Sequence, residues 1–84
     1  MARLRKFNQY FYNTSHGYFK IVTYRQFDPD QFRIEYYRRK FFFFWEDRGS
    51  ETFYNMFDAT QALKNMKIRF EKLGKLVKQK TSRE

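Results

Sequence analysis

Apolar residues in the C-terminal third of the chain recur at the spacing of a helix. At about 100° per residue one stripe collects Ala59, Ala62, Leu63, Met66, Phe70, Leu73 and Val77. Asp58 stands at the start of this stripe, and Gln61 follows three residues later, which is the pattern of a capping box. The sequence therefore predicts one long helix over residues 58–80, with Asp58 as its N-cap and residues 81–84 as a frayed tail.

The rest of the chain has the alternation and composition of β-strands. In residues 32–36 the apolar side chains of Phe32, Ile34 and Tyr36 fall on one face, and polar side chains fall on the other. Further strands are expected over 7–12, 19–24, 41–45 and 51–57, separated by turns at 13–17, 28–31 and 47–50. The run Phe-Phe-Phe-Phe-Trp at 41–45 is apolar on both faces, which predicts a central strand.

Together these elements predict an α+β fold, an antiparallel meander of four to five short strands with one long C-terminal helix packed on one face. With 84 residues we expect a single domain, made of a basic arm at 1–6, strands within 7–57 and the helix at 58–80. Aromatic residues make up 24% of the chain, more than one helix can cover. The surplus rings must line the second sheet face, or the sheet must curl, or a second subunit must cover them.

One short stretch resembles a known kind of domain. Residues 53–64, Phe-Tyr-Asn-Met-Phe-Asp-Ala-Thr-Gln-Ala-Leu-Lys, resemble the last strand and helix start of apetala-type and integrase-type DNA-binding domains. The resemblance implies a sheet packed on one helix, as in those three-stranded domains. The Arg- and Gly-bearing first strand of the apetala family is not found in this sequence, so no binding residue is carried over.

The composition excludes several classes of function. Cysteine is absent, which excludes disulfides, a Cys-ligated zinc site and a thiol nucleophile, and favours a cytoplasmic location. No apolar run approaches the ~20 residues of a membrane span, so we expect no membrane partner. The single histidine, His16, falls in a predicted turn, and neither a phosphate-binding loop nor a nucleophile motif occurs. We therefore expect a protein that is not an enzyme and uses no cofactor or metal.

The charge of the chain points to an anionic partner. The net charge is +9, and it is concentrated in residues 1–45 and 61–84, each at +6, whereas residues 46–60 carry −3. Basic residues interleaved with aromatic rings form the primary candidate site: Arg25, Arg33, Tyr37, Arg38, Arg39 and Lys40. Arginine contacts phosphate and stacks on bases, and tyrosine offers a flat π surface, as binding of single-stranded nucleic acid requires. The alternative is a solvated sheet face on which arginine stems cover apolar surface.

Two further groups of basic residues are secondary candidates. They are Arg3, Arg5 and Lys6 in the arm, and Lys64, Lys67, Lys75 and Lys78 on the outer side of the predicted helix. A basic arm can follow a phosphate backbone, but a disordered start explains it equally well. Lysines on a helix face are usually a solvated surface.

The leading hypothesis is a small basic protein that binds nucleic acid, either DNA or RNA, through its aromatic and arginine-rich sheet face. The second is a viral or mobile-element protein that uses the same face to bind and inhibit a host protein in the host cytoplasm. The third is a small subunit of a ribonucleoprotein assembly. A homodimer formed through the surplus rings is compatible with each of them.

Overall fold

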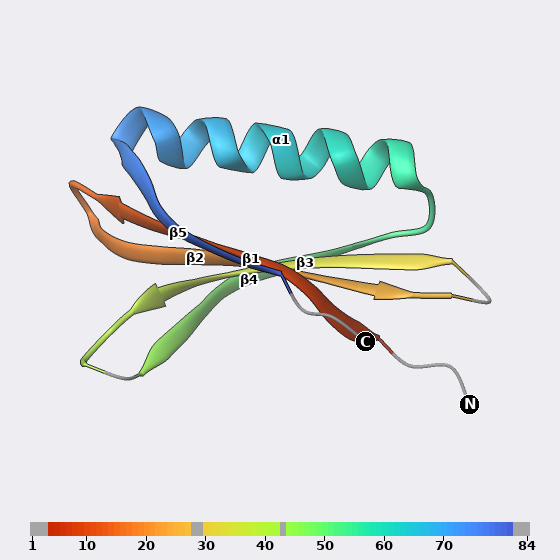
Figure 1. The fold of residues 1–84 in the computed structure, drawn as a ribbon, viewed down its shortest axis with the longest axis horizontal. Helices are drawn as coiled ribbons and strands as arrows, with labels where there is room; N and C mark the ends of the chain where they lie inside the picture. The colour runs from red at the N-terminus through yellow and green to blue at the C-terminus, as the bar shows by residue number, and fades with distance from the viewer. Residues whose placement is uncertain (1–3, 28–29, 43, 82–84) are drawn as a thin grey trace.

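The computed structural model describes residues 4–27, 30–42 and 44–81, which form one antiparallel sheet and one helix (Figure 1). The elements follow in the order β1 (Arg5–Thr14), β2 (Gly17–Gln26), β3 (Gln31–Arg39), β4 (Trp45–Phe53), α1 (Met56–Leu73) and β5 (Gly74–Thr81). The strands lie in the order β4-β3-β2-β1-β5, and all four neighbouring pairs are antiparallel. The predicted α+β class, with an antiparallel meander and a helix on one face, is confirmed.

The core lies between α1 and the facing side of the sheet. The Phe70 ring is buried, and its centroid lies 5.5 Å from that of Tyr12, 5.0 Å from Phe19 and 6.3 Å from Tyr36. Tyr12 is fully buried, donates its hydroxyl to Glu71 Oε2 at 3.5 Å and has its pKa raised to about 12, chiefly by burial. The predicted apolar face of β3 is confirmed, because it packs beneath this helix.

The helix begins earlier than the sequence predicted. Its N-cap is Asn55, whose side-chain oxygen accepts the backbone N–H of Asp58 at 2.8 Å. The Asn55 amide in turn donates to Asp58 Oδ2 at 2.8 Å. Asp58 as the N-cap was therefore wrong. It lies in the first turn, where its carboxylate completes a reciprocal cap and favours the helix dipole.

The helix also ends earlier than predicted, because residues 74–81 form strand β5 rather than further helical turns. β5 pairs with β1, from Gly74 opposite Thr14 to Thr81 opposite Asn8. The backbone of Gly74 runs so close to β1 that a Cβ there would overlap the carbonyl oxygen of Asn13. Pairing with β5 satisfies the backbone groups along the otherwise open edge of β1, which a longer helix would leave without partners.

The phenylalanine run does not form the predicted central strand. Residues 40–44 connect β3 to β4, closed by a hydrogen bond from the Lys40 N–H to the Phe44 carbonyl at 2.9 Å. Phe41, Phe42 and Phe44 are 66%, 85% and 67% exposed, and Phe43 lies outside the described residues. β3 continues to Arg39 and β4 begins at Trp45, so the phenylalanines between them are needed for the connection.

The predicted turn at 47–50 was also wrong, because these residues lie inside β4. Gly49 stands there with a φ of 155°, next to an irregularity in the pairing with β3. A Cβ at Gly49 would come within 2.6 Å of Tyr36 Cε1, so glycine lets this ring lie against the strand.

Part of the expected arm and the first residue of the expected tail belong to strands. Arg5 and Lys6 belong to β1, which replaces the predicted basic arm, and Thr81 ends β5. Arg3 and residues 82–84 lie outside the described residues, as do Asp28 and Pro29 of the predicted turn between β2 and β3.

Replacing Phe70 by alanine should lower the free energy of unfolding by about 3–5 kcal/mol, because the ring is buried among three others. Chemical denaturation followed by circular dichroism measures this change. Phe57→Ala is the control, since Phe57 lies on the same helix and is 71% exposed. Equal stability of the two variants would contradict the packing of α1 on the sheet.

Gly74→Ala distinguishes the observed strand from the longer helix by the sign of its effect. Within a helix the change stabilises by about 1 kcal/mol. Against the β1 backbone it should destabilise by about 1–3 kcal/mol or more, because the added methyl group has no room. A raised melting temperature for Gly74→Ala would contradict the position of β5.

Candidate functional site

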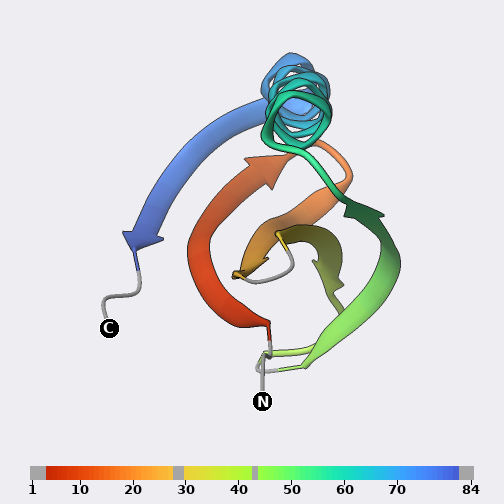
Figure 2. The same ribbon diagram turned by 90° about the vertical axis from the view of Figure 1, so that its right-hand side faces the viewer.

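The sheet curls over its second face, the one turned away from α1. The rings of Phe11 on β1 and Trp45 on β4 lie edge to face with centroids 6.0 Å apart, although β2 and β3 separate the two strands. In a flat sheet, strands three positions apart are about 14 Å from each other. Figure 2 shows β1 and β4 curving toward each other on the side opposite the helix. Val22 lies on this face and is only 2% exposed. Of the three arrangements that the sequence left open for the surplus rings, the structure shows rings on the second face and a curled sheet.

Lysine side chains gather on these two rings. Lys20 Nζ lies 4.5 Å from the Trp45 ring centroid, and Lys78 Nζ and Lys80 Nζ lie 6.0 Å and 5.9 Å from the Phe11 centroid. We call Phe11, Lys20, Trp45, Lys78 and Lys80 the second-face cluster. It draws its members from β1, β2, β4 and β5, and it exists only because the sheet curls and β5 joins the edge of β1.

The ammonium groups of this cluster repel one another. The pKa of Lys20 is lowered, first by burial and then by the charges of Lys6 and Lys80. Lys6 belongs to the same face, because its register partner is Tyr24 on β2. Repulsion between like charges raises the free energy of the protein alone, and an anion placed between the lysines would relieve it.

On the part of this face formed by β3, the carboxylate of Glu35 lies between Arg33 and Tyr37. Glu35 accepts a hydrogen bond from Arg33 Nε at 2.7 Å through one oxygen and from the Tyr37 hydroxyl through the other. The pKa of Tyr37 is raised by burial and then by this bond and the charge of Glu35. Arg33 and Tyr37 are therefore tied to a protein carboxylate, which restricts their use toward an external phosphate.

The structure divides the predicted primary site between the two faces of the sheet. Arg33, Tyr37 and Arg39 lie on the second face, with the Arg39 guanidinium 4.3 Å from the Tyr18 ring centroid. Arg25 and Arg38 lie on the face turned toward α1, because their register partners are Phe32 and Phe19 of that face. Lys40 lies in the β3–β4 connection, with Nζ 3.8 Å from Glu46 Oε2.

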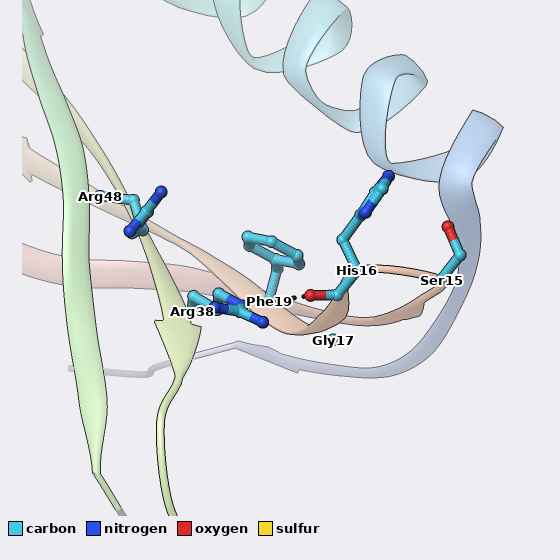
Figure 3. Close-up of a pocket in the computed structure, with 6 residues that line it drawn as sticks. All are labelled: Ser15, His16, Gly17, Phe19, Arg38 and Arg48. Atoms are coloured by element: carbon cyan, nitrogen blue, oxygen red, sulfur yellow. Dashed lines mark hydrogen bonds between the residues drawn. The ribbon is translucent and has the colours of Figure 1, made fainter.

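Both arginines on the helix side already have partners. Arg25 stacks on Phe27 and Phe32, with its guanidinium carbon 4.3 Å and 4.8 Å from their centroids. Arg38 Nε donates to the His16 carbonyl at 3.1 Å, beside a shallow depression at the β1–β2 turn (Figure 3). Arg48 lines the same depression and donates to Glu46 Oε1 at 2.9 Å. The depression is cationic, but the Arg38 guanidinium joins β3 to the β1–β2 turn and the Arg48 guanidinium pairs with Glu46 of its own strand.

The secondary lysines separate as well. Lys64 is exposed on α1, and Lys67 lies on the Tyr10 ring with Nζ 4.4 Å from its centroid. Lys75 and Lys78 lie on β5 rather than on a helix, and only Lys78 of these four reaches the second-face cluster. The alternation of Lys78 and Lys80 is the sequence signal for this strand, since period two places both on one face.

Other kinds of site find no support in the described part of the chain. There, no group of histidine, cysteine, aspartate or glutamate side chains is placed to hold a metal ion. Among the same residues there is no helix that combines the length and the apolar character needed to cross a membrane.

Known proteins give no guide to the role of the second face. No known family matches this chain, and neither a curated protein nor a solved structure matches it.

Glu35→Gln should lower the pKa of Tyr37, because it removes a negative charge beside the phenol. Ultraviolet difference titration of tyrosine ionisation measures the shift, and Tyr37→Phe identifies which step belongs to this residue. Glu46→Gln is the matched control, since Glu46 pairs with Lys40 and Arg48 instead. If both glutamine variants titrate like the wild type, Glu35 does not hold Tyr37.

Proposed function

We propose that this protein binds nucleic acid, without enzymatic activity, through the second face of its sheet. The convergence of Lys20, Lys78 and Lys80 on the rings of Phe11 and Trp45 is the observation that carries the proposal. Lysines neutralise phosphates and release counterions, and aromatic rings offer stacking surface to bases. A phosphate backbone relieves the repulsion between the lysines, which the free protein retains.

The charge of the whole second face supports the same partner. Register and ring contacts place seven described basic residues there, against the acidic residues Glu35 and Asp47: Lys6, Lys20, Arg33, Arg39, Lys75, Lys78 and Lys80. Seven basic against two acidic residues give the second face a net charge of +5, out of +9 for the chain. A face with this net positive charge attracts a polyanion and orients it on approach. A role as a subunit of an intracellular ribonucleoprotein assembly would use the same surface.

A second candidate function is binding of a protein partner, including a host factor or a second copy of this chain. It is favoured by an apolar pocket of about 150 Å³ between α1 and the sheet, lined by Phe7, Phe32, Met56 and Leu63 among others. Phe7 and Met56 are exposed at its rim. Apolar surface gathered at a pocket is typical of a protein contact. This surface differs from the second-face cluster, so variants can separate the two functions.

Salt dependence of binding tests the proposed function. Each of the changes Lys20→Gln, Lys78→Gln and Lys80→Gln should reduce the slope of log affinity against log salt by about 0.7 for a single strand. The measurement is a fluorescence-anisotropy titration with labelled DNA and RNA at several salt concentrations. Circular dichroism of each variant confirms that the fold is retained.

Lys64→Gln is the control, because it removes the same charge from the exposed surface of α1. Its slope should stay at the wild-type value. An equal loss in Lys64→Gln would show that net charge alone attracts the nucleic acid. Affinity no higher than that of an unrelated protein of equal charge would exclude the proposed function.

A further inference from the structure

A pocket opens at the end of the second face, where β3 passes into its connection with β4. It has a volume of about 380 Å³ and is lined by Tyr18, Arg39, Lys40, Phe41 and Phe42. Arg39 pairs in register with Trp45, whose ring belongs to the second-face cluster. The pocket and the cluster are therefore neighbours on one surface, and a single chain molecule could contact both.

Two of the rings that line this pocket are exposed to water, which is unfavourable for large apolar side chains. Phe41 and Phe42 are among the exposed aromatic residues of the molecule, in a connection that the core does not absorb. Beside them the Arg39 guanidinium stacks on the Tyr18 ring, with 4.3 Å between its central carbon and the ring centroid. Flat π surfaces next to a stacked guanidinium are the elements with which proteins hold unpaired bases.

We propose that this pocket receives unpaired nucleobases of a single strand whose phosphates lie along the second-face cluster. The inference rests on the proposed function and adds the class of nucleic acid. Bases in a duplex are stacked and paired, so they do not present a free face to Tyr18, Phe41 or Phe42. Lysines bind the phosphates of either form, whereas the pocket favours the single strand.

An anionic lipid surface fits the same loop less well. Anchoring at such a surface draws on several cations around the inserted rings. Lys40 and Arg48 are both paired with Glu46, with N–O distances of 3.8 Å and 2.9 Å. Arg39 is stacked on Tyr18 at the wall of the pocket, where one cation suffices for one phosphate. The other lysines of this surface lie in the second-face cluster rather than around the exposed rings, an arrangement that favours a chain molecule contacting both places over a membrane at the loop.

The test compares three labelled ligands in the same buffer: an oligothymidylate, an abasic strand of the same length and a duplex. The wild-type protein should bind oligothymidylate about tenfold more tightly than the abasic strand, since stacking of a base contributes on that order. The double variant Phe41→Ala/Phe42→Ala should lose this preference and keep its affinity for the abasic strand. Phe57→Ala, equally exposed on α1, should behave as the wild type.

Three results would overturn the inference, and they are distinguishable. Equal affinity of the wild type for oligothymidylate and the abasic strand would show that bases are not bound, while leaving the proposed function intact. An oligothymidylate preference that persists in the double variant, together with loss of binding to phosphatidylserine-containing vesicles, would assign the loop to a membrane. Absence of salt-sensitive binding to all three ligands would exclude the proposed function itself.

Discussion

The contact between Phe11 and Trp45 determines how this small protein covers its sheet. A single helix packs on one face, where Phe70 meets the rings of β1, β2 and β3. The other face has no second layer among the described residues, and the sheet curls over it (Figure 2). The curl brings Phe11 of β1 and Trp45 of β4 into contact, which buries part of this face. Because the two rings are large and apolar, their contact removes apolar surface from water on a face that no second layer covers.

The curl has an electrostatic consequence. It brings the middle of β2 close to Trp45, and the addition of β5 to the edge of β1 places two more lysines over Phe11. The pKa of Lys20 falls as a result, through burial and through the nearby charges. The same geometry that shields apolar surface thus concentrates positive charge around it. A surface of this kind is ready for a polyanion, because the repulsion is already present before the ligand arrives.

The sequence predicts the elements whose signals are local. The helical stripe through Phe70 and the alternation of β3 are strong periodic patterns, and both are confirmed. Residues 74–80 were wrongly assigned to the helix, because Val77 fits the helical stripe while the pairing with β1 depends on residues far away in the chain. The run at 41–45 has no periodicity, and its place follows from the length of β3. Period-two alternation is enough to put Tyr37 and Arg39 on one face of β3. The role of Glu35 and the meeting of Phe11, Lys20 and Trp45 instead depend on tertiary contacts.

The most direct test of the central claim is a heteronuclear NMR titration of the protein with a single-stranded oligonucleotide. Trp45 is the only tryptophan of the chain, so its indole N–H gives one isolated signal on the curled face. We predict that this signal and the side-chain signals of Phe11 and Lys20 shift during the titration, whereas the backbone signals of Lys64 and Ile68 on α1 stay in place. Shifts confined to α1, with an unchanged Trp45 signal, would contradict the account.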